Sequence, residues 1–476
     1  MAAKKLLNAE GDVVEEMVQG ILACHPNITR LEGTAVLLRA DVEAVKASSV
    51  TLVSGGGSGH EPSHGGWLGA GMLTAAVCGG VFASPSVEAV LSAIRACAGP
   101  AGVLVIVKNY TGDRLNFGLA CEQAKAEGIR CEMLIVGDDC AVMERDEDKI
   151  AGRRGIAGTV FVHKCAGAAA AGGASLEQVL AVATAAEQSV GSVGVALDVC
   201  TLPGQPKNAR LGAADLEMGL GIHGEPGTEK LAMTSADDIV DRMLKMICSG
   251  GGCRWEGGLA DQSVALLVND LGSTPVMEQY VVARRAIEQL EASGATVARV
   301  FVGPFMTSLD MSGVSLTVFK LAQFEDHAKE AVKARPSMSL SPGWIKLGTE
   351  PLALLDAPTG APAWPAAFAI ERTPAAPAPV PAGPALEVTA ARGPTLDAEG
   401  AASLRSAVLA AVEAVVAAEA DLTAWDAVAG DGDCGPEQPR PSLSAAAQAA
   451  DRVCACVHRR DDEARRGEGG GRPREP

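Results

Sequence analysis

The stretch Val103-Leu-Val-Ile-Val-Lys-Asn-Tyr-Thr-Gly-Asp113 decides the fold class of this chain. Its apolar run predicts a strand buried on both faces, and the polar loop after it leads into a helical stretch from Arg114 to about Glu127. Strand, loop and helix in this order form the unit of an α/β fold, in which ligands bind at the carboxyl ends of the strands. We therefore expect Lys108 and Asp113 at a ligand-binding edge. The alternative for Lys108 is a solvated lysine at a strand end.

Two further loops carry a histidine between glycines. Gly55-Gly-Gly-Ser-Gly-His-Glu-Pro62 follows the apolar run 50–53, and Gly219-Leu-Gly-Ile-His-Gly-Glu-Pro-Gly227 lies far downstream. Glycines leave an imidazole uncrowded, so the two loops predict a small polar substrate held between His60 and His223, one of which attacks a carbonyl. Each motif alone also fits a histidine in a surface turn. The strand-end positions of His60, Lys108 and Asp113 favour a functional site.

Strands and helices alternate along the chain up to about residue 345. After the first unit we expect strands at 131–136, 159–162, 192–197, 264–268, 297–302 and 315–319. Helical stretches such as 176–188 and 280–292 separate them. Near-continuous apolar strands with intervening helices predict sheets covered on both faces. The length favours two α/β lobes, at about 1–195 and 196–350.

Composition excludes several classes of partner. The net charge of -18 argues against nucleic acid and against an anionic membrane surface. No apolar run approaches about 18 residues, so we expect no membrane span, and the N-terminus lacks the apolar core of a signal peptide. The 13 cysteines are scattered without a CxxC pair, which is typical of reduced thiols in the cytoplasm.

The composition changes after the α/β region. Residues 351–394 are rich in Ala and Pro, which predicts an extended linker. A helix then begins near Asp397 and runs to about Ala420, with apolar residues at helical spacing, and predicts the start of a helical domain at 395–435. Residues 436–476 combine prolines and charges without apolar periodicity, as in disordered tails.

Several of these segments resemble the dihydroxyacetone kinase family, in particular its animal triokinase/FMN cyclase type. The resemblance lies in residues 54–62, 107–118, 151–155, 219–225 and 306–317. It covers roughly residues 1–350 and a short stretch near 395–435. It implies an α/β, two-lobed substrate-binding kinase domain with mixed or parallel sheets, followed by the start of an all-α nucleotide-binding domain. It also implies ATP-dependent phosphorylation of dihydroxyacetone or glyceraldehyde by a cytoplasmic homodimer.

The resemblance gives each residue of the substrate half a role. His223 would add to the substrate carbonyl and form a hemiaminal, which excludes a polyol such as glycerol because it has no carbonyl. Asp113 would act as general base on the hydroxyl that attacks the γ-phosphorus, and His60 would hydrogen-bond the substrate. The remaining substrate-binding residues would be Gly57, Ser58, Gly59 and Lys108. His60 and His64 have the spacing of a helical metal pair, but the glycines around them disfavour that hypothesis.

The nucleotide half would begin in Asp426-Ala-Val-Ala-Gly-Asp-Gly-Asp-Cys-Gly435, which resembles the family's metal motif. The resemblance implies that Asp426, Asp431 and Asp433 hold Mg²⁺ on ATP, with Gly432 and Cys434 near the nucleotide. An acidic glycine turn or a weak calcium loop is the alternative. No Gly-x4-Gly-Lys-Ser/Thr motif is present, which excludes a P-loop.

After Gly435 the resemblance stops, so three functions stay open. The chain is a triose kinase, a triose-binding protein with an incomplete nucleotide domain, or a regulatory form that pairs with longer subunits. The family's animal members also split FAD to AMP and cyclic FMN, a lyase reaction for which Mn²⁺ or Co²⁺ could serve.

Overall fold

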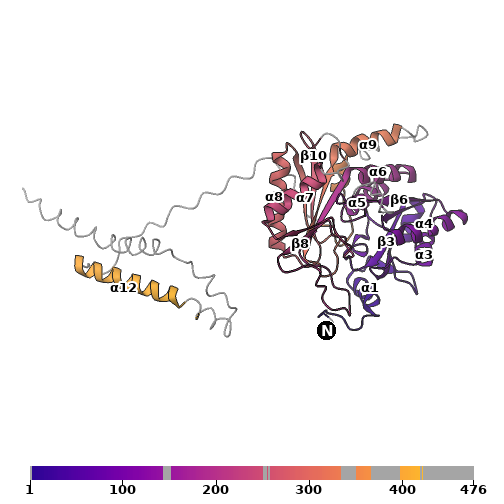
Figure 1. Cartoon of the computed structure of the whole chain (residues 1–476). Coiled ribbons are helices and arrows are strands. Elements are labelled where there is room, and N and C mark those ends of the chain that lie inside the picture. Colours follow the sequence, from indigo (N-terminus) through magenta and orange to yellow (C-terminus); the bar gives the residue numbers. More distant parts are fainter. Residues whose placement is uncertain are drawn as a thin grey trace, which may run out of the picture. The chain divides into compact units, whose positions relative to one another are not determined.

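The computed structural model describes residues 3–142, 152–249, 255, 258–333, 350–365, 397–418 and 421 (Figure 1). The chain divides into two units, residues 1–376 and 377–476. The first unit contains both sheets, and the described part of the second contains the helix α12, Ala398–Ala417. This helix confirms the one predicted from about 397 to 420.

The first sheet contains six strands in the order β1-β2-β4-β3-β5-β6. Their bounds are β1 Ile28–Arg30, β2 Val36–Arg39, β3 Thr51–Ser58, β4 Ala75–Val81, β5 Val103–Lys108 and β6 Cys131–Val136. The strands β4, β3, β5 and β6 run parallel, whereas β1 and β2 form an antiparallel edge. Because β3 and β5 are parallel neighbours, the loops after them meet at one edge of the sheet.

The second sheet also contains six strands, in the order β11-β10-β12-β7-β8-β9. Their bounds are β7 Val190–Ala196, β8 Asp215–Met218, β9 Glu229–Ala232, β10 Ser263–Asp270, β11 Thr296–Gly303 and β12 Gly313–Lys320. Only β10 and β11 pair in parallel within this sheet. Two mixed sheets connected by helices confirm the predicted α/β class, and the second sheet begins at β7, close to the expected change of lobe.

Helices cover both sheets (Figure 1). The first unit contains α1 Val13–Cys24, α2 Val42–Ser48, the 3-10 turn η1 Gly65–Trp67, α3 Val87–Cys97, α4 Thr111–Ala126, α5 Thr159–Ala171, α6 Leu176–Ser189, α7 Ala236–Ser249, α8 Val276–Ala292, α9 Leu321–Lys333 and α11 Pro351–Asp356. Figure 1 shows α3 and α4 on the outer side of the first sheet and α7 and α8 on the outer side of the second, with α5 and α6 between the sheets. One apolar core accordingly joins residues of both sheets, such as Leu52 and Phe319.

One predicted strand is wrong. Residues 159–162 form the first turn of α5 rather than a strand. Every residue of this helix from Thr159 to Ala170 is buried, because α5 lies between the two sheets. A helix that is buried all round has no polar face, so a short apolar run within it cannot be distinguished from a buried strand by its periodicity.

The expected linker also differs from the structure at its beginning. Residues 351–356 form α11, whose Leu354 and Leu355 are buried. The Lys164 ammonium of α5 donates hydrogen bonds to the carbonyl oxygens of Leu354 and Ala357, both at 2.7 Å. Trp364 packs against Phe301 and Trp67. Residues 350–365 therefore belong to the packed unit, because apolar side chains stand between their prolines and alanines.

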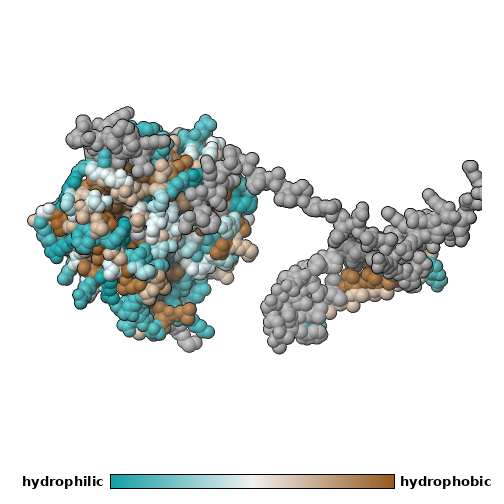
Figure 2. All heavy atoms as spheres, turned by 180° about the vertical axis from the view of Figure 1, so that it is seen from behind, coloured by the Kyte–Doolittle hydropathy of each residue, from teal (hydrophilic) through white to brown (hydrophobic). Residues whose placement is uncertain are grey.

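The surface of the first unit mixes both kinds of residue. Figure 2 shows hydrophilic and hydrophobic residues interspersed over the face that it displays. Within the described part of the chain, none of the helices combines the length and the apolarity needed to cross a bilayer.

Candidate active site

The glycine-rich stretch before His60 is part of a strand, not of a flexible loop. β3 runs through Gly55, Gly56 and Gly57 to Ser58, and all its residues are buried. A Cβ on Gly57 would lie 2.7 Å from backbone atoms of Phe82 and Ala83. Gly56 has a φ of +153°, and a Cβ there would lie 2.4 Å from Lys108 Nζ. These positions require glycine because neighbouring groups approach the strand closely.

His60 follows β3 and is completely buried. Its Nδ1 lies 2.8 Å from the carbonyl oxygen of Thr307, which can only accept, so Nδ1 carries the proton and donates. Nε2 then holds the lone pair, and this nitrogen is buried without a hydrogen-bond partner among the residues that the structure describes. Burial lowers the pKa of His60 well below its usual range, and the nearby His223 and Lys108 lower it further. His60 is therefore neutral, and its Nε2 carries a lone pair that can accept a hydrogen bond.

His223 lies in the loop between β8 and β9, beside His60. The two ring centroids are 4.8 Å apart at an interplanar angle of 80°. Phe82 stacks on His60 at a centroid distance of 4.9 Å and meets the His223 ring edge-on at 5.1 Å. Tyr110 also meets the His223 ring edge-on, at 4.6 Å. We call His60, Phe82, Tyr110 and His223 the aromatic cage. It brings together residues from four separate segments of the chain.

Glu225 orients the His223 ring. One carboxylate oxygen accepts from His223 Nδ1 at 2.8 Å, and the other accepts from the His223 backbone N–H at 2.9 Å. Burial raises the pKa of Glu225, but the hydrogen bonds and charge of His223 outweigh it and lower the pKa to about 2. An ionised carboxylate holds the proton on Nδ1 and so favours the tautomer whose lone pair lies on Nε2.

Lys108 and Asp113 form a second, buried cluster next to β3. Lys108 is 1% exposed, which excludes the solvated alternative, and its Nζ lies 3.7 Å from an Asp113 oxygen. Burial lowers the pKa of Lys108 below its usual value, although the nearby Asp113 charge acts in the opposite direction. The other oxygen of this carboxylate accepts from Ser84 Oγ at 2.5 Å. Asp113 lies in the first turn of α4, where the helix N-terminus also favours a negative charge.

His64 belongs to the same cluster. Its Nε2 lies 3.1 Å from Lys108 Nζ, which can only donate, so Nε2 accepts. A nitrogen occupied by an ammonium group does not ligate a metal, which argues against the predicted alternative of a His60–His64 pair. Among the described residues, no group of three or more His, Cys, Asp or Glu side chains could hold a metal ion.

Ser58 and Gly59, which are predicted to bind substrate, form hydrogen bonds within the protein. Ser58 Oγ donates to the carbonyl oxygen of Gly79 at 2.7 Å. The Gly59 N–H donates to the carboxylate of Glu61 at 3.0 and 3.2 Å. Both interactions fix the path of the chain into His60.

The sequence did not assign Phe82, Tyr110, Thr307 or Glu225 to the site. Tyr110 and Glu225 stand inside the quoted motifs, so their position was a usable signal. Thr307 lies in the segment 306–317 that carries the family resemblance, whereas Phe82, which follows β4, has no local signal. The predicted nucleotide residues Asp426, Asp431, Gly432, Asp433 and Cys434 lie outside the described residues.

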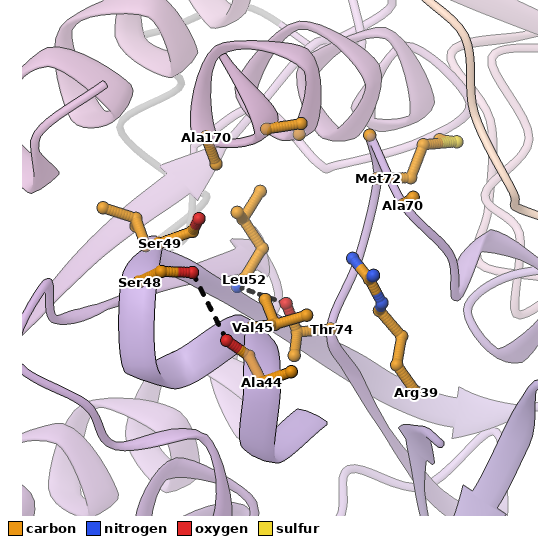
Figure 3. Close-up of a pocket in the computed structure, with 14 residues that line it drawn as sticks. Arg39, Ala44, Val45, Ser48, Ser49, Leu52, Ala70, Met72, Thr74 and Ala170 are labelled. Atoms are coloured by element: carbon orange, nitrogen blue, oxygen red, sulfur yellow. Dashed lines mark hydrogen bonds between the residues drawn. The ribbon is translucent and has the colours of Figure 1, made fainter. Parts of the chain in front are cut away.

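A separate cavity of about 240 Å³ lies at the opposite edge of the first sheet (Figure 3). It is lined by Val50 and Leu52 at the start of β3, whereas His60 follows the end of that strand. Three of its polar side chains are engaged within the protein: Ser48 donates to the Ala44 carbonyl, Thr74 accepts from the Leu52 N–H, and Arg39 pairs with Asp41. The cavity is therefore not part of the histidine site.

Comparison with known proteins identifies the family. The family model described as the Dak1 domain matches residues 19–338. The chain belongs to the dihydroxyacetone kinase family. The human triokinase/FMN cyclase is 40% identical over 450 residues, which are 92% of this chain and 71% of the human protein. The dihydroxyacetone-binding subunit DhaK of Listeria innocua is 47% identical over 321 residues, 67% of this chain and 94% of that subunit.

The fold agrees with solved structures of this dihydroxyacetone kinase family. The crystal structure of the C. freundii dihydroxyacetone kinase in complex with AMP-PNP and Mg²⁺ gives a TM-score of 0.68 at 35% identity and covers 96% of this chain and 75% of that chain. Its native form gives the same values. Nucleotide and Mg²⁺ binding therefore occur within the family.

Proposed function

We propose that this chain captures the carbonyl group of dihydroxyacetone or glyceraldehyde on His223 and presents the substrate for ATP-dependent phosphorylation. The observation that carries the proposal is the hydrogen bond from His223 Nδ1 to Glu225 at 2.8 Å inside the aromatic cage. The bond leaves the nucleophilic lone pair on Nε2. The names of the relatives, which include dihydroxyacetone kinases and a triokinase, support the same substrate class.

Capture is an addition that breaks only the carbonyl π bond. The His223 Nε2 lone pair forms a bond to the carbonyl carbon, and the π electrons move to the carbonyl oxygen, which takes a proton from water. The ring gains positive charge while Nδ1 keeps its proton, and the ionised Glu225 stabilises that charge at 2.8 Å. A polyol offers no such electrophilic carbon, so the site distinguishes a triose from glycerol.

His60 and Asp113 then serve the hydroxyl to be phosphorylated. The unpartnered Nε2 of His60 accepts a hydrogen bond from the substrate and restrains it beside His223. Asp113 is the proposed general base, since its carboxylate is held by Ser84 and Lys108 in the cluster next to β3. Gly57 and Lys108 are predicted to bind substrate; we assign Gly57 to the packing of the strand and Lys108 to a positive charge beside that base.

The nucleotide would be held by residues of the second unit. Asp426, Asp431 and Asp433 offer the hard oxygen ligands that Mg²⁺ prefers, and Mg²⁺ supplies charge neutralisation on the ATP phosphates.

The test separates capture from phosphorylation. Purified protein is mixed with dihydroxyacetone labelled with ¹³C at the carbonyl carbon, and NMR follows conversion of the ketone carbon to a tetrahedral one. We expect a tetrahedral signal with the unaltered chain and none with His223→Ala, while His25→Ala, at the C-terminal end of α1, serves as the control. Addition of ATP and Mg²⁺ then tests for the triose phosphate.

A tetrahedral signal that persists in His223→Ala would refute the proposed nucleophile. Capture without turnover would support a triose-binding protein rather than a kinase. Glycerol is the negative control for the ligand, because it cannot form the adduct.

A further inference from the structure

The segment Ala151-Gly-Arg-Arg-Gly155 has no part in the function proposed above, yet its second arginine connects the two sheets. Arg154 Nε donates to an Asp139 carboxylate oxygen at 2.8 Å, and its Nη2 lies 2.6 Å from the same oxygen. Nη2 also donates to the carbonyl oxygen of Gly219 at 2.6 Å. Asp139 follows β6 of the first sheet, whereas Gly219 begins the loop that carries His223 after β8 of the second.

The anchor of this bridge is rigid. The Asp139 side chain is 2% exposed, and its other oxygen accepts from the Ala141 N–H at 2.9 Å. The backbone N–H of the same aspartate donates to the Arg154 carbonyl at 3.1 Å. Asp139 also forms an isolated β-bridge with Ser192 of β7. Arg154 therefore reaches the His223 loop from a fixed point between the two sheets.

Arg154 and Glu225 lie against the same glycine of that loop. A Cβ on Gly221 would lie 2.7 Å from Arg154 Nη1 and 2.0 Å from Glu225 Oε2. The Arg154 guanidinium group and the Glu225 carboxylate, which orients His223, thus both pack against Gly221. Burial lowers the pKa of Arg154, but the charges of Asp139 and, to a smaller extent, Glu225 act against it, and the net effect is a raised pKa.

We propose that Arg154 is a positioning residue for His223: it fixes the 219–225 loop so that Glu225 stays on Nδ1 and the lone pair stays on Nε2. Only a planar guanidinium can bind a carboxylate and a backbone carbonyl through one rigid group; a lysine ammonium supplies the charge without this geometry. This inference rests on the proposed capture by His223.

The experiment compares Arg154→Ala and Arg154→Lys with the control Arg299→Lys. Arg299 binds Asp356 at 3.0 and 2.6 Å and is 10% exposed, against 12% for Arg154, so the control changes a similarly buried arginine elsewhere. The first readout is the tautomer of His223 in protein labelled with ¹⁵N at histidine, measured without substrate. The second is the affinity for carbonyl-labelled dihydroxyacetone.

We expect Arg154→Ala to lose the predominance of the Nδ1–H tautomer and to bind dihydroxyacetone about tenfold or more weakly, as for loss of a hydrogen bond to a charged group. Arg154→Lys should give values between those of Arg154→Ala and the unaltered chain. Arg299→Lys should leave both readouts unchanged. Added guanidinium ion should restore part of the affinity of Arg154→Ala. If Arg154→Ala does not fold, Arg154→Lys and Arg154→Gln carry the test.

An unchanged tautomer and affinity in these variants would overturn the inference. Failure of the proposed function looks different, because the unaltered chain would then form no tetrahedral adduct at all. The tautomer measurement still decides the role of Arg154 in that case, since it needs no substrate.

Discussion

Replacing Glu225 by Gln should impair carbonyl capture although the two side chains have nearly the same shape. The carboxylate accepts two hydrogen bonds from His223, from Nδ1 and from the backbone N–H. An amide has one accepting oxygen and one donating nitrogen. If its oxygen keeps the backbone N–H, its nitrogen donates to Nδ1 and moves the ring proton to Nε2, which removes the nucleophilic lone pair. In the reverse orientation two donors face each other.

The structure sets the size of this effect. Glu225→Gln loses one hydrogen bond to a charged group, which is worth roughly 1.5–3 kcal/mol. We therefore expect the affinity for dihydroxyacetone to fall roughly 10- to 100-fold, since about 1.4 kcal/mol corresponds to a factor of ten. Glu229→Gln is the matched control, because it removes the same charge from an exposed position on β9.

The pH dependence adds a second expectation. The pKa of Glu225 is lowered from 4.5 to about 2 in the folded protein, so the unfolded chain binds the proton more readily. The stabilisation is thus fully present above pH 4.5 and is lost as the pH falls toward 2. The difference in unfolding free energy between the unaltered chain and Glu225→Gln should shrink over that interval.

Affinity is measured by titration of carbonyl-labelled dihydroxyacetone at neutral pH, and unfolding by urea at each pH. Equal affinity of Glu225→Gln and the unaltered chain would refute the argument that this carboxylate selects the His223 tautomer. A stability difference that stays constant down to the lowest pH would contradict the assigned ionisation.

Three other changes test the packing, a buried charge and the base. Gly57→Ala should lower the unfolding free energy by about 1–3 kcal/mol, since the added Cβ lies 2.7 Å from backbone atoms. In urea titrations the control Gly80→Ala, whose Cβ has only a contact at 3.6 Å, should lower the unfolding free energy much less. The pKa of Lys164 is lowered by burial to about 8 from 10.5, so the unfolded state binds more protons between these values and stability should rise with pH there. Lys164→Met should lack that rise in urea titrations across the interval; an identical slope would contradict it. Asp113→Asn should keep the affinity for dihydroxyacetone but reduce phosphorylation by about 100-fold or more; undiminished turnover in a coupled kinase assay would exclude Asp113 as the base.

Local sequence pattern was sufficient for most of the fold. The runs at 103–107, 131–136 and 264–268 formed strands at the predicted positions, because each is a short apolar stretch bounded by polar or glycine residues. The pattern failed at 159–162 and at the start of the predicted linker. In both places burial depends on packing against elements that are distant in the sequence, and local sequence periodicity does not report such packing.

The sequence by itself determined the α/β class and correctly placed His60, Lys108 and Asp113 at the carboxyl ends of neighbouring strands. It could do so because parallel strands bring the loops after them to one edge of a sheet, whatever the details of packing. Only the tertiary structure decided which hydrogen-bond partners surround these residues and the His223 loop. The tautomer of His60 depends on Thr307, and the position of the His223 loop depends on Arg154 anchored at Asp139. These partners are distant in the sequence, and hydrogen bonds select them only once the two sheets have packed together.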